Sequence, residues 1–253
     1  MDTLLWILVF IIGMSASFID SAFKMGYGLA TPALILLGLD PKVVVSTLLF
    51  SQLFAGFTKT IYFSIYRNVP YVKQEQEAKL NIFYIITGML GMIFAIILVY
   101  LLLETFILLY VAIMIIFVGV ITLTKKKLKF TARRFYLISM ISGFNQSISA
   151  AGYGPLATYQ EFMKDGDYKK TRAITSIAEA ILSGFGFLLY FILFDDVIIE
   201  VDLLIILITT GMISTPFGSL TSDMLNKRKA KIIIGITSII IGILLLLRIF
   251  SII

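Results

Sequence analysis

Long apolar stretches separated by short charged segments form the dominant pattern of this chain. The windows 80–103, 105–124 and 232–247 contain almost no charged residue. A helix of about 20 apolar residues crosses a hydrocarbon core of about 30 Å, because each residue adds about 1.5 Å. The pattern therefore predicts an all-α membrane protein, a polytopic helical bundle that crosses the bilayer many times.

Composition agrees with this prediction and excludes several kinds of chemistry. Hydrophobic residues make up 59% of the 253 residues and charged residues 14%, whereas soluble domains carry about 25% charged residues. The mean hydropathy is +1.01. Cysteine and histidine are both absent, which excludes disulfides and makes a zinc site improbable. We expect no cofactor and no metal.

The positive charge indicates topology rather than nucleic-acid binding. Segments 67–79, 125–134, 164–172 and 227–231 hold 17 of the 21 Lys and Arg residues. The segment 195–202 has four acids and no base, and the turn at Glu104 also has no base. Because basic loops stay in the cytoplasm, the four basic segments are predicted inside and the other two outside. Both termini then lie outside, and the expected location is the plasma membrane of a prokaryote.

A duplicated triplet marks an internal repeat. Gly26-Tyr27-Gly28 and Gly152-Tyr153-Gly154 lie 126 residues apart, and each interrupts an apolar stretch. Further matches follow at nearly the same offset, such as Thr87-Gly88-Met89 with Thr210-Gly211-Met212. Glycine permits a helix to break inside a membrane. Two breaks at corresponding positions are typical of transporters whose binding site lies between repeats.

The repeat divides the chain into two halves. Each contains one hairpin and three spans, about eight full spans in all. Since the hairpin returns to its starting side and three spans follow, equivalent loops fall on opposite sides of the membrane. The hairpin arms, such as the 16 residues of 4–19, suit re-entrant segments better than full spans, and a complete crossing by the longer first arm stays open. The predicted elements are a first repeat at 1–124 (hairpin 4–38, spans 43–66, 80–103 and 105–124), a basic linker at 125–134, and a second repeat at 135–253 (hairpin 135–163, spans 173–194, 203–221 and 232–250).

The hairpin tips carry the candidate binding chemistry. A helix that begins within the membrane has several N–H groups without partners. These donors and the positive end of the helix dipole favour a bound anion. Two inverted repeats would direct two such helix starts at one site near the middle of the bilayer. The predicted substrate-binding residues are Ser21, Lys24, Gly26, Tyr27 and Gly28 in the first half, and Asn145, Gln146, Ser147, Ser149, Gly152, Tyr153 and Gly154 in the second.

Ionisable residues inside the predicted spans are the candidates for coupling. An ionisable group in the membrane is costly and needs a partner or a polar cavity. Asp20 lies four residues before Lys24 and could pair with it on a helix, and Glu179 lies in the span 173–194. Lys59 is expected to extend toward the inner surface. Asp20 and Glu179 are therefore coupling candidates, with Gln52, Ser51 and Ser176 as secondary site residues.

Two motifs resemble the signatures of the TauE/SafE sulfite exporter family. The first comprises Asp20-Ser21, Met25-Gly26-Tyr27-Gly28, Pro32, Gly38 and Pro41. The second comprises Ser142-Gly143-Phe144 and Gly152-Tyr153-Gly154-Pro155, and Ser176-Ile177-Ala178-Glu179 resembles that family's second-repeat helix. Lys24 departs from the family pattern, in which this position is often glycine. The resemblance implies a carrier of sulfite, sulfonates or related organosulfur anions.

The predicted function is secondary transport of a small sulfur-containing anion by alternating access, with proton coupling left open. The partners are the anionic substrate and the lipid bilayer, without nucleic acid. A passive anion channel is an alternative. An intramembrane enzyme is another; the absence of histidine excludes a Ser-His dyad, although a Ser-Lys pair at Lys24 stays chemically possible.

Overall fold

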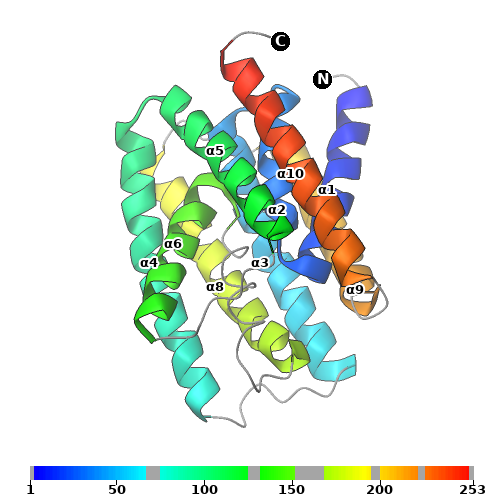
Figure 1. Cartoon of the computed structure of the whole chain (residues 1–253), viewed down its shortest axis with the longest axis vertical. Helices are drawn as coiled ribbons and strands as arrows, with labels where there is room; N and C mark the ends of the chain where they lie inside the picture. Colours follow the sequence, from blue (N-terminus) through cyan, green and yellow to red (C-terminus); the bar gives the residue numbers. More distant parts are fainter. Residues whose placement is uncertain are drawn as a thin grey trace.

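The structure is a computed structural model that describes residues 3–66, 75–124, 132–151, 168–194, 200–221 and 226–250. Those residues form helices and short connections without any strand. Figure 1 shows the helices gathered into one bundle. Their bounds are α1 Thr3–Phe23, α2 Gly26–Leu36, α3 Pro41–Tyr66, α4 Glu75–Leu101, α5 Glu104–Leu123, α6 Ala132–Ser149, α8 Tyr168–Leu193, α9 Val201–Thr221 and α10 Lys227–Ile249.

The outer surface of the bundle is apolar, as a bilayer requires. Within the described residues, seven helices are long and apolar enough to cross a membrane. On α4 the side chains of Ile86, Leu90 and Phe94 follow each other at every turn, and each is about half exposed. A stripe of this kind would be a liability in water, whereas lipid chains cover it. The chain is thus a polytopic all-α membrane protein, as the hydropathy pattern predicts.

The first hairpin has one long arm and one short arm. Helix α1 has 21 residues and reaches Phe23, or about 32 Å, so the predicted arm of 16 residues was too short. The helix continues because the polar residues Ser17, Asp20 and Ser21 are buried against other helices and do not end it. Helix α2 has only 11 residues, about 16 Å, and cannot cross the bilayer alone.

The turn between α1 and α2 depends on backbone shape. Lys24 follows the end of α1 with a φ of 62°, a left-handed conformation that non-glycine residues rarely adopt. Gly26 begins α2, and a Cβ atom there would collide with the backbone carbonyl of Ala16. Helix α6 ends in the same way, because Ala150 has a φ of 51°. Lys24 and Ala150 lie 126 positions apart, so the two hairpin tips share this unusual turn.

Four pairs of helices make the largest contacts: α3 with α8, α5 with α10, α1 with α9, and α4 with α6. Small residues allow the close approach. Gly91 of α4 lies against the backbone carbonyl of Met140, and Gly143 of α6 lies against that of Gly88. Helix α3 is the most buried of the seven long helices. The interface of α3 with α8 therefore occupies the middle of the bundle.

The far end of α2 is held by the last helix. Arg248 of α10 donates through one nitrogen to the backbone carbonyls of Ile35 and Leu36, at 2.7 and 2.8 Å. These carbonyls lie in the last turn of α2, where the regular helical N–H partners run out; that of Ile35 also accepts from the N–H of Gly38 at 2.9 Å. The first residue of α1 and the last of α10 lie at the same end of the molecule (Figure 1). The division into two repeats stays a prediction.

Candidate anion-binding site

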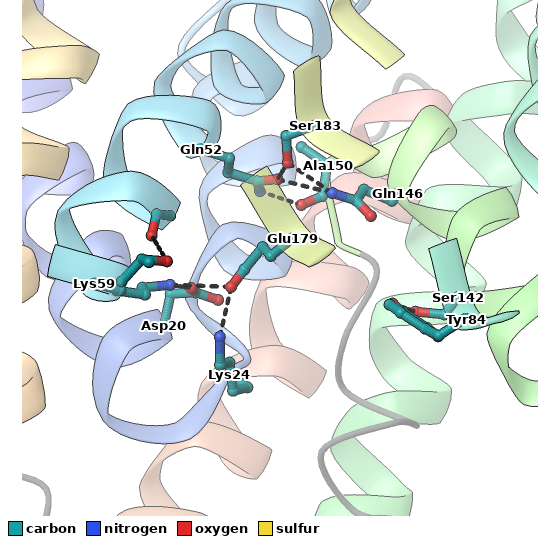
Figure 2. A network of polar contacts seen from close by, with 12 residues as sticks. Asp20, Lys24, Gln52, Lys59, Tyr84, Ser142, Gln146, Ala150, Glu179 and Ser183 are labelled. Atoms are coloured by element: carbon teal, nitrogen blue, oxygen red, sulfur yellow. Dashed lines mark hydrogen bonds and ion pairs between the residues drawn. The ribbon is translucent and has the colours of Figure 1, made fainter. Parts of the chain in front are cut away.

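Four charged side chains meet near the first hairpin tip. They come from α1, from the turn before α2, from α3 and from α8. The Nζ atom of Lys24 lies 2.5 Å from Oε2 of Glu179, and that of Lys59 lies 2.5 Å from Oδ2 of Asp20. Lys59 also lies 3.3 Å from Oε2 of Glu179. Figure 2 shows the contacts, and we call Asp20, Lys24, Lys59 and Glu179 the charged cluster.

The charged cluster is almost entirely shielded. The four residues are between 1% and 6% exposed. Isolated charges at such depth would be very costly, so each must be compensated by a partner. Two cations and two carboxylates give a formal net charge of zero. The site is therefore electrically balanced in this state.

Two expectations about these residues were wrong. The side chain of Lys24 contacts Glu179 instead of the nearby Asp20. The N–H of Lys24 still donates to the carbonyl of Asp20 at 2.8 Å, but its left-handed backbone changes the direction of the side chain, so helical i, i+4 pairing does not apply. Lys59 does not extend to the membrane surface but points inward to Asp20. The inward direction of Lys59 could have been inferred from its spacing. It lies seven residues after Gln52 and so on the same face of α3.

A second group of polar side chains is uncharged. Nε2 of Gln52 donates to the backbone carbonyl of Ala150 at 2.5 Å, and the hydroxyl of Ser183 donates to Oε1 of Gln52 at 2.9 Å. Nε2 of Gln146 donates to the hydroxyl of Ser183 at 2.8 Å. We call Gln52, Gln146, Ala150 and Ser183 the neutral cluster (Figure 2). Ser183, which lies one turn after Glu179 on α8, was not among the predicted site residues.

The two clusters correspond by position. Asp20 matches Gln146 and Lys24 matches Ala150 at an offset of 126, while Gln52 matches Glu179 at an offset of 127. In the charged cluster, Glu179 of the second half contacts Lys24 at the first hairpin tip. In the neutral cluster, Gln52 of the first half contacts Ala150 at the second hairpin tip. The charges differ, and so does the fourth member of each cluster, because Lys59 and Ser183 do not occupy corresponding positions. The interior thus contains one charged and one uncharged version of a similar arrangement.

The remaining predicted residues lie near these clusters. The hydroxyls of Tyr27 and Ser17 are 3.3 Å apart, and Ser51 donates to the carbonyl of Leu207 at 2.6 Å. Asn145 accepts from the hydroxyl of Tyr110. Ser176 is fully buried. The hydroxyls of Ser21 and Ser147 and Oε1 of Gln146 are buried with no hydrogen-bond partner among the described residues.

Both hairpin tips border one cavity. It offers about 50 Å³ to the centre of a water molecule, several times the space that one water needs. Asp20, Lys24 and Glu179 reach it from the charged cluster, while Val111, Met114, Ile115 and Val118 of α5 form an apolar wall. A Cβ atom on Gly28 would lie 3.0 Å from the Cβ of Ala151, so the tips also touch. The predicted residues that line the cavity are Asp20, Lys24, Tyr27, Gly28, Gln52, Asn145, Ser149 and Glu179.

Part of the predicted site cannot be compared with the structure. Gly152, Tyr153 and Gly154 lie outside the described residues. Gly26, Ser21, Gln146, Ser147, Ser51 and Ser176 are described but do not line the cavity. For the described residues, no group of three or more acids could hold a metal ion, and each acid of the charged cluster contacts a lysine.

The chemistry of this cavity suits a small anion. The start of α2 has no side-chain cap at Met25, so its first N–H groups and the positive end of its dipole lie beside Lys24. A family model described as "Sulfite exporter TauE/SafE" matches residues 6–245. The chain belongs to the TauE/SafE sulfite exporter family. The comparisons with curated proteins and with solved structures gave no match.

Membership in the TauE/SafE family gives the class of protein in which the charged cluster and the cavity occur. The match covers nearly all of the 253 residues and includes both hairpin tips. TauE/SafE proteins are membrane transporters, not enzymes. The buried charged cluster, the cavity and the outer apolar surface thus occur in a chain from a family that exports sulfur anions.

Proposed function

We propose that this protein is a secondary transporter of small sulfur-containing anions, such as sulfite and sulfonates, in the plasma membrane. The observation that carries the proposal is the position of Lys24, which borders a cavity at the start of α2. A cation and unpaired helix N–H groups at one point favour an oxyanion. Tyr27, Asn145 and Ser149 add polar groups to the walls. The second predicted helix start, at Gly152 and Gly154, lies outside the described residues.

The packing of α5 and α10 supports an inverted repeat. Gly119 of α5 lies close to Ile239, and Gly242 of α10 lies close to Ile116. Because Gly119 matches Gly242 and Ile116 matches Ile239 at the same offset of 123, the two contacts are reciprocal. A two-fold axis between two halves produces reciprocal contacts. A two-fold axis in the membrane plane is the symmetry of many secondary transporters.

The interface of α1 with α9 and that of α4 with α6 support the same proposal. Ser214 of α9 donates to the carbonyl of Met14 at 2.7 Å, and Gly91 of α4 lies against the carbonyl of Met140. Ser214 matches Gly91 at an offset of 123, and Met14 matches Met140 at 126. Related helices thus meet at related positions. Transport would proceed by rocking of the halves around the cavity, so that it opens to one side and then the other.

Uptake into proteoliposomes tests the proposal. Purified protein should accumulate radiolabelled sulfite or a sulfonate with saturable kinetics, and planar bilayers should show no anion conductance. Lys24→Met should reduce the uptake at least about tenfold, since it removes the cation while Glu179 keeps Lys59. Lys229→Met, which changes an exposed lysine in the segment at the start of α10, is the control and should transport normally. Folded protein that moves no sulfur oxyanion would contradict the proposal.

A further inference from the structure

The contact between Glu179 and Lys24 occupies the place where the substrate should bind. Lys24 borders the cavity, and its Nζ atom lies 2.5 Å from the carboxylate of Glu179. A carboxylate and a sulfonate are both oxyanions that accept hydrogen bonds from an ammonium group. An incoming anion would therefore compete with Glu179 for the same cation.

Glu179 has a second partner available. Lys59 lies 3.3 Å from the same oxygen, Oε2, while it also holds Asp20 at 2.5 Å. The carboxylate could therefore release Lys24 without losing all of its compensating charge. Lys24, in turn, lies at a turn in the left-handed conformation, outside any helix.

The charge balance determines what else must happen. The charged cluster has a formal net charge of zero, so a bound monovalent anion would leave one uncompensated negative charge in a shielded site. Excess charge of this kind is costly in a membrane interior. A proton on Glu179 restores neutrality and also removes its attraction for Lys24. Substrate binding and protonation of Glu179 thus favour each other.

We propose that the Glu179 carboxylate is a tethered competitor of the transported anion: binding of the anion at Lys24 displaces Glu179, which takes up one proton. The inference rests on the proposed function and adds its coupling. One proton accompanies each monovalent anion, so the loaded site is electrically neutral. The proton adds to a carboxylate oxygen, and no covalent bond to the substrate forms.

The groups around Glu179 restrict which residue can take the proton. The elements packed near it present two lysines, one further carboxyl and three phenols. Helix α6 presents Gln146 and Ser149, which do not titrate. Asp20 is held by Lys59 at 2.5 Å, whereas Glu179 is the acid that loses a partner when Lys24 turns to the substrate. Among the described residues, the buried titratable groups that these elements present are Asp20 of α1, Lys24 at the tip, Tyr27 of α2, Lys59 and Tyr62 of α3, and Tyr84 of α4.

Binding of methanesulfonate to the purified full-length chain tests this inference. The sulfonate stays a monovalent anion between about pH 5.5 and about pH 8, so its own charge does not change over this range. Wild-type affinity, measured by calorimetry, should rise up to about tenfold for each unit of falling pH if one proton is taken up. Glu179→Gln should bind equally at both pH values, at least about tenfold more tightly than wild type at about pH 8.

Controls and a second measurement make the outcomes distinct. Glu104→Gln removes an exposed carboxylate and should keep the wild-type affinity and pH dependence.

If Glu179→Gln does not fold, proton uptake by wild-type protein in weakly buffered solution gives the answer: about one proton for each bound anion is expected, and none would overturn the inference. Identical pH dependence in wild type and Glu179→Gln would also overturn it, while binding itself would still favour the proposed function. No binding of sulfite or methanesulfonate by either folded protein would instead remove the proposed function and the inference together.

Discussion

The hydroxyl of Thr31 donates a hydrogen bond to the backbone carbonyl of Ser149 across 2.6 Å, which joins the two hairpins across 118 positions of sequence. Thr31 lies on α2, and Ser149 is the last residue of α6. Such carbonyls at a helix end need partners. The bond therefore helps to keep the two tips in contact at the cavity.

Replacement of Thr31 by valine should destabilise the protein. Valine keeps the shape of the side chain but leaves the carbonyl of Ser149 without this donor in a buried place, which costs about 1–3 kcal/mol. The melting temperature in detergent should fall accordingly. The matched control is Thr209→Val, because Thr209 is exposed and bonds only within its own helix. Equal melting temperatures of the two variants would show that the bond is unimportant.

Removal of the Lys59 charge alone should destabilise the protein more than removal of the charges of both Lys59 and Asp20. Lys59→Met leaves the carboxylate of Asp20 buried without its cation, and loss of one partner of a buried ion pair costs about 3–5 kcal/mol. We expect little folded protein in size-exclusion chromatography. The double variant Asp20→Asn/Lys59→Met should recover much of it, since no uncompensated charge remains at that position. A double variant as unstable as Lys59→Met would contradict this reading of the charged cluster.

Gly28 should tolerate no large side chain, because it lies where the tips touch. A Cβ atom there would already lie 3.0 Å from the Cβ of Ala151, so the branched side chain of Gly28→Val would separate the tips. Transport of sulfite into proteoliposomes should fall at least about tenfold, with expression largely unchanged, because one overpacked position costs about 1–3 kcal/mol. Adding Ala151→Gly makes room and should restore part of the transport. Full activity of Gly28→Val would argue against contact of the tips during transport.

The absence of cysteine makes the topology directly measurable. Single cysteines can be introduced at Glu104, predicted outside, and at Lys229, predicted inside; both positions are exposed. A membrane-impermeant maleimide added to intact cells should label Glu104→Cys and should label Lys229→Cys only after the membrane is opened. The reverse pattern would place both termini in the cytoplasm.

Hydropathy alone predicted the fold class because lipid imposes a simple requirement on composition. Helices such as α4 and α5 must be long and apolar, so their sequences reveal them. The end of α1 was harder to predict. Asp20 and Ser21 would end a helix that faces lipid, but here they face the protein interior, and only the packing of α1 against its neighbours provides that interior.

The arrangement of the candidate site could be anticipated only in part, for a similar reason. The duplicated glycines pointed to the tips, and Lys24 and Glu179 were both recognised as unusual. Their contact was not predicted, since 155 positions separate them and their approach depends on the packing of α8 beside α3 and the first tip. Lys59 was misplaced because a lysine near the end of a membrane helix usually reaches the surface. A contact with a residue on another helix cannot be inferred from the spacing of residues along one helix.

The restriction of charge to one of the two related clusters has a consequence for the energetics of a transport cycle. In a carrier with two identical inverted halves, the inward-open and outward-open forms would be equal in free energy, and an empty carrier would spend half its time in each. Here the proposed rocking of the halves moves two lysines and two carboxylates relative to the two membrane faces. The inward-open and outward-open forms therefore differ in free energy. The empty protein then populates the two forms unequally, and a change of charge at Glu179 alters the ratio of these populations.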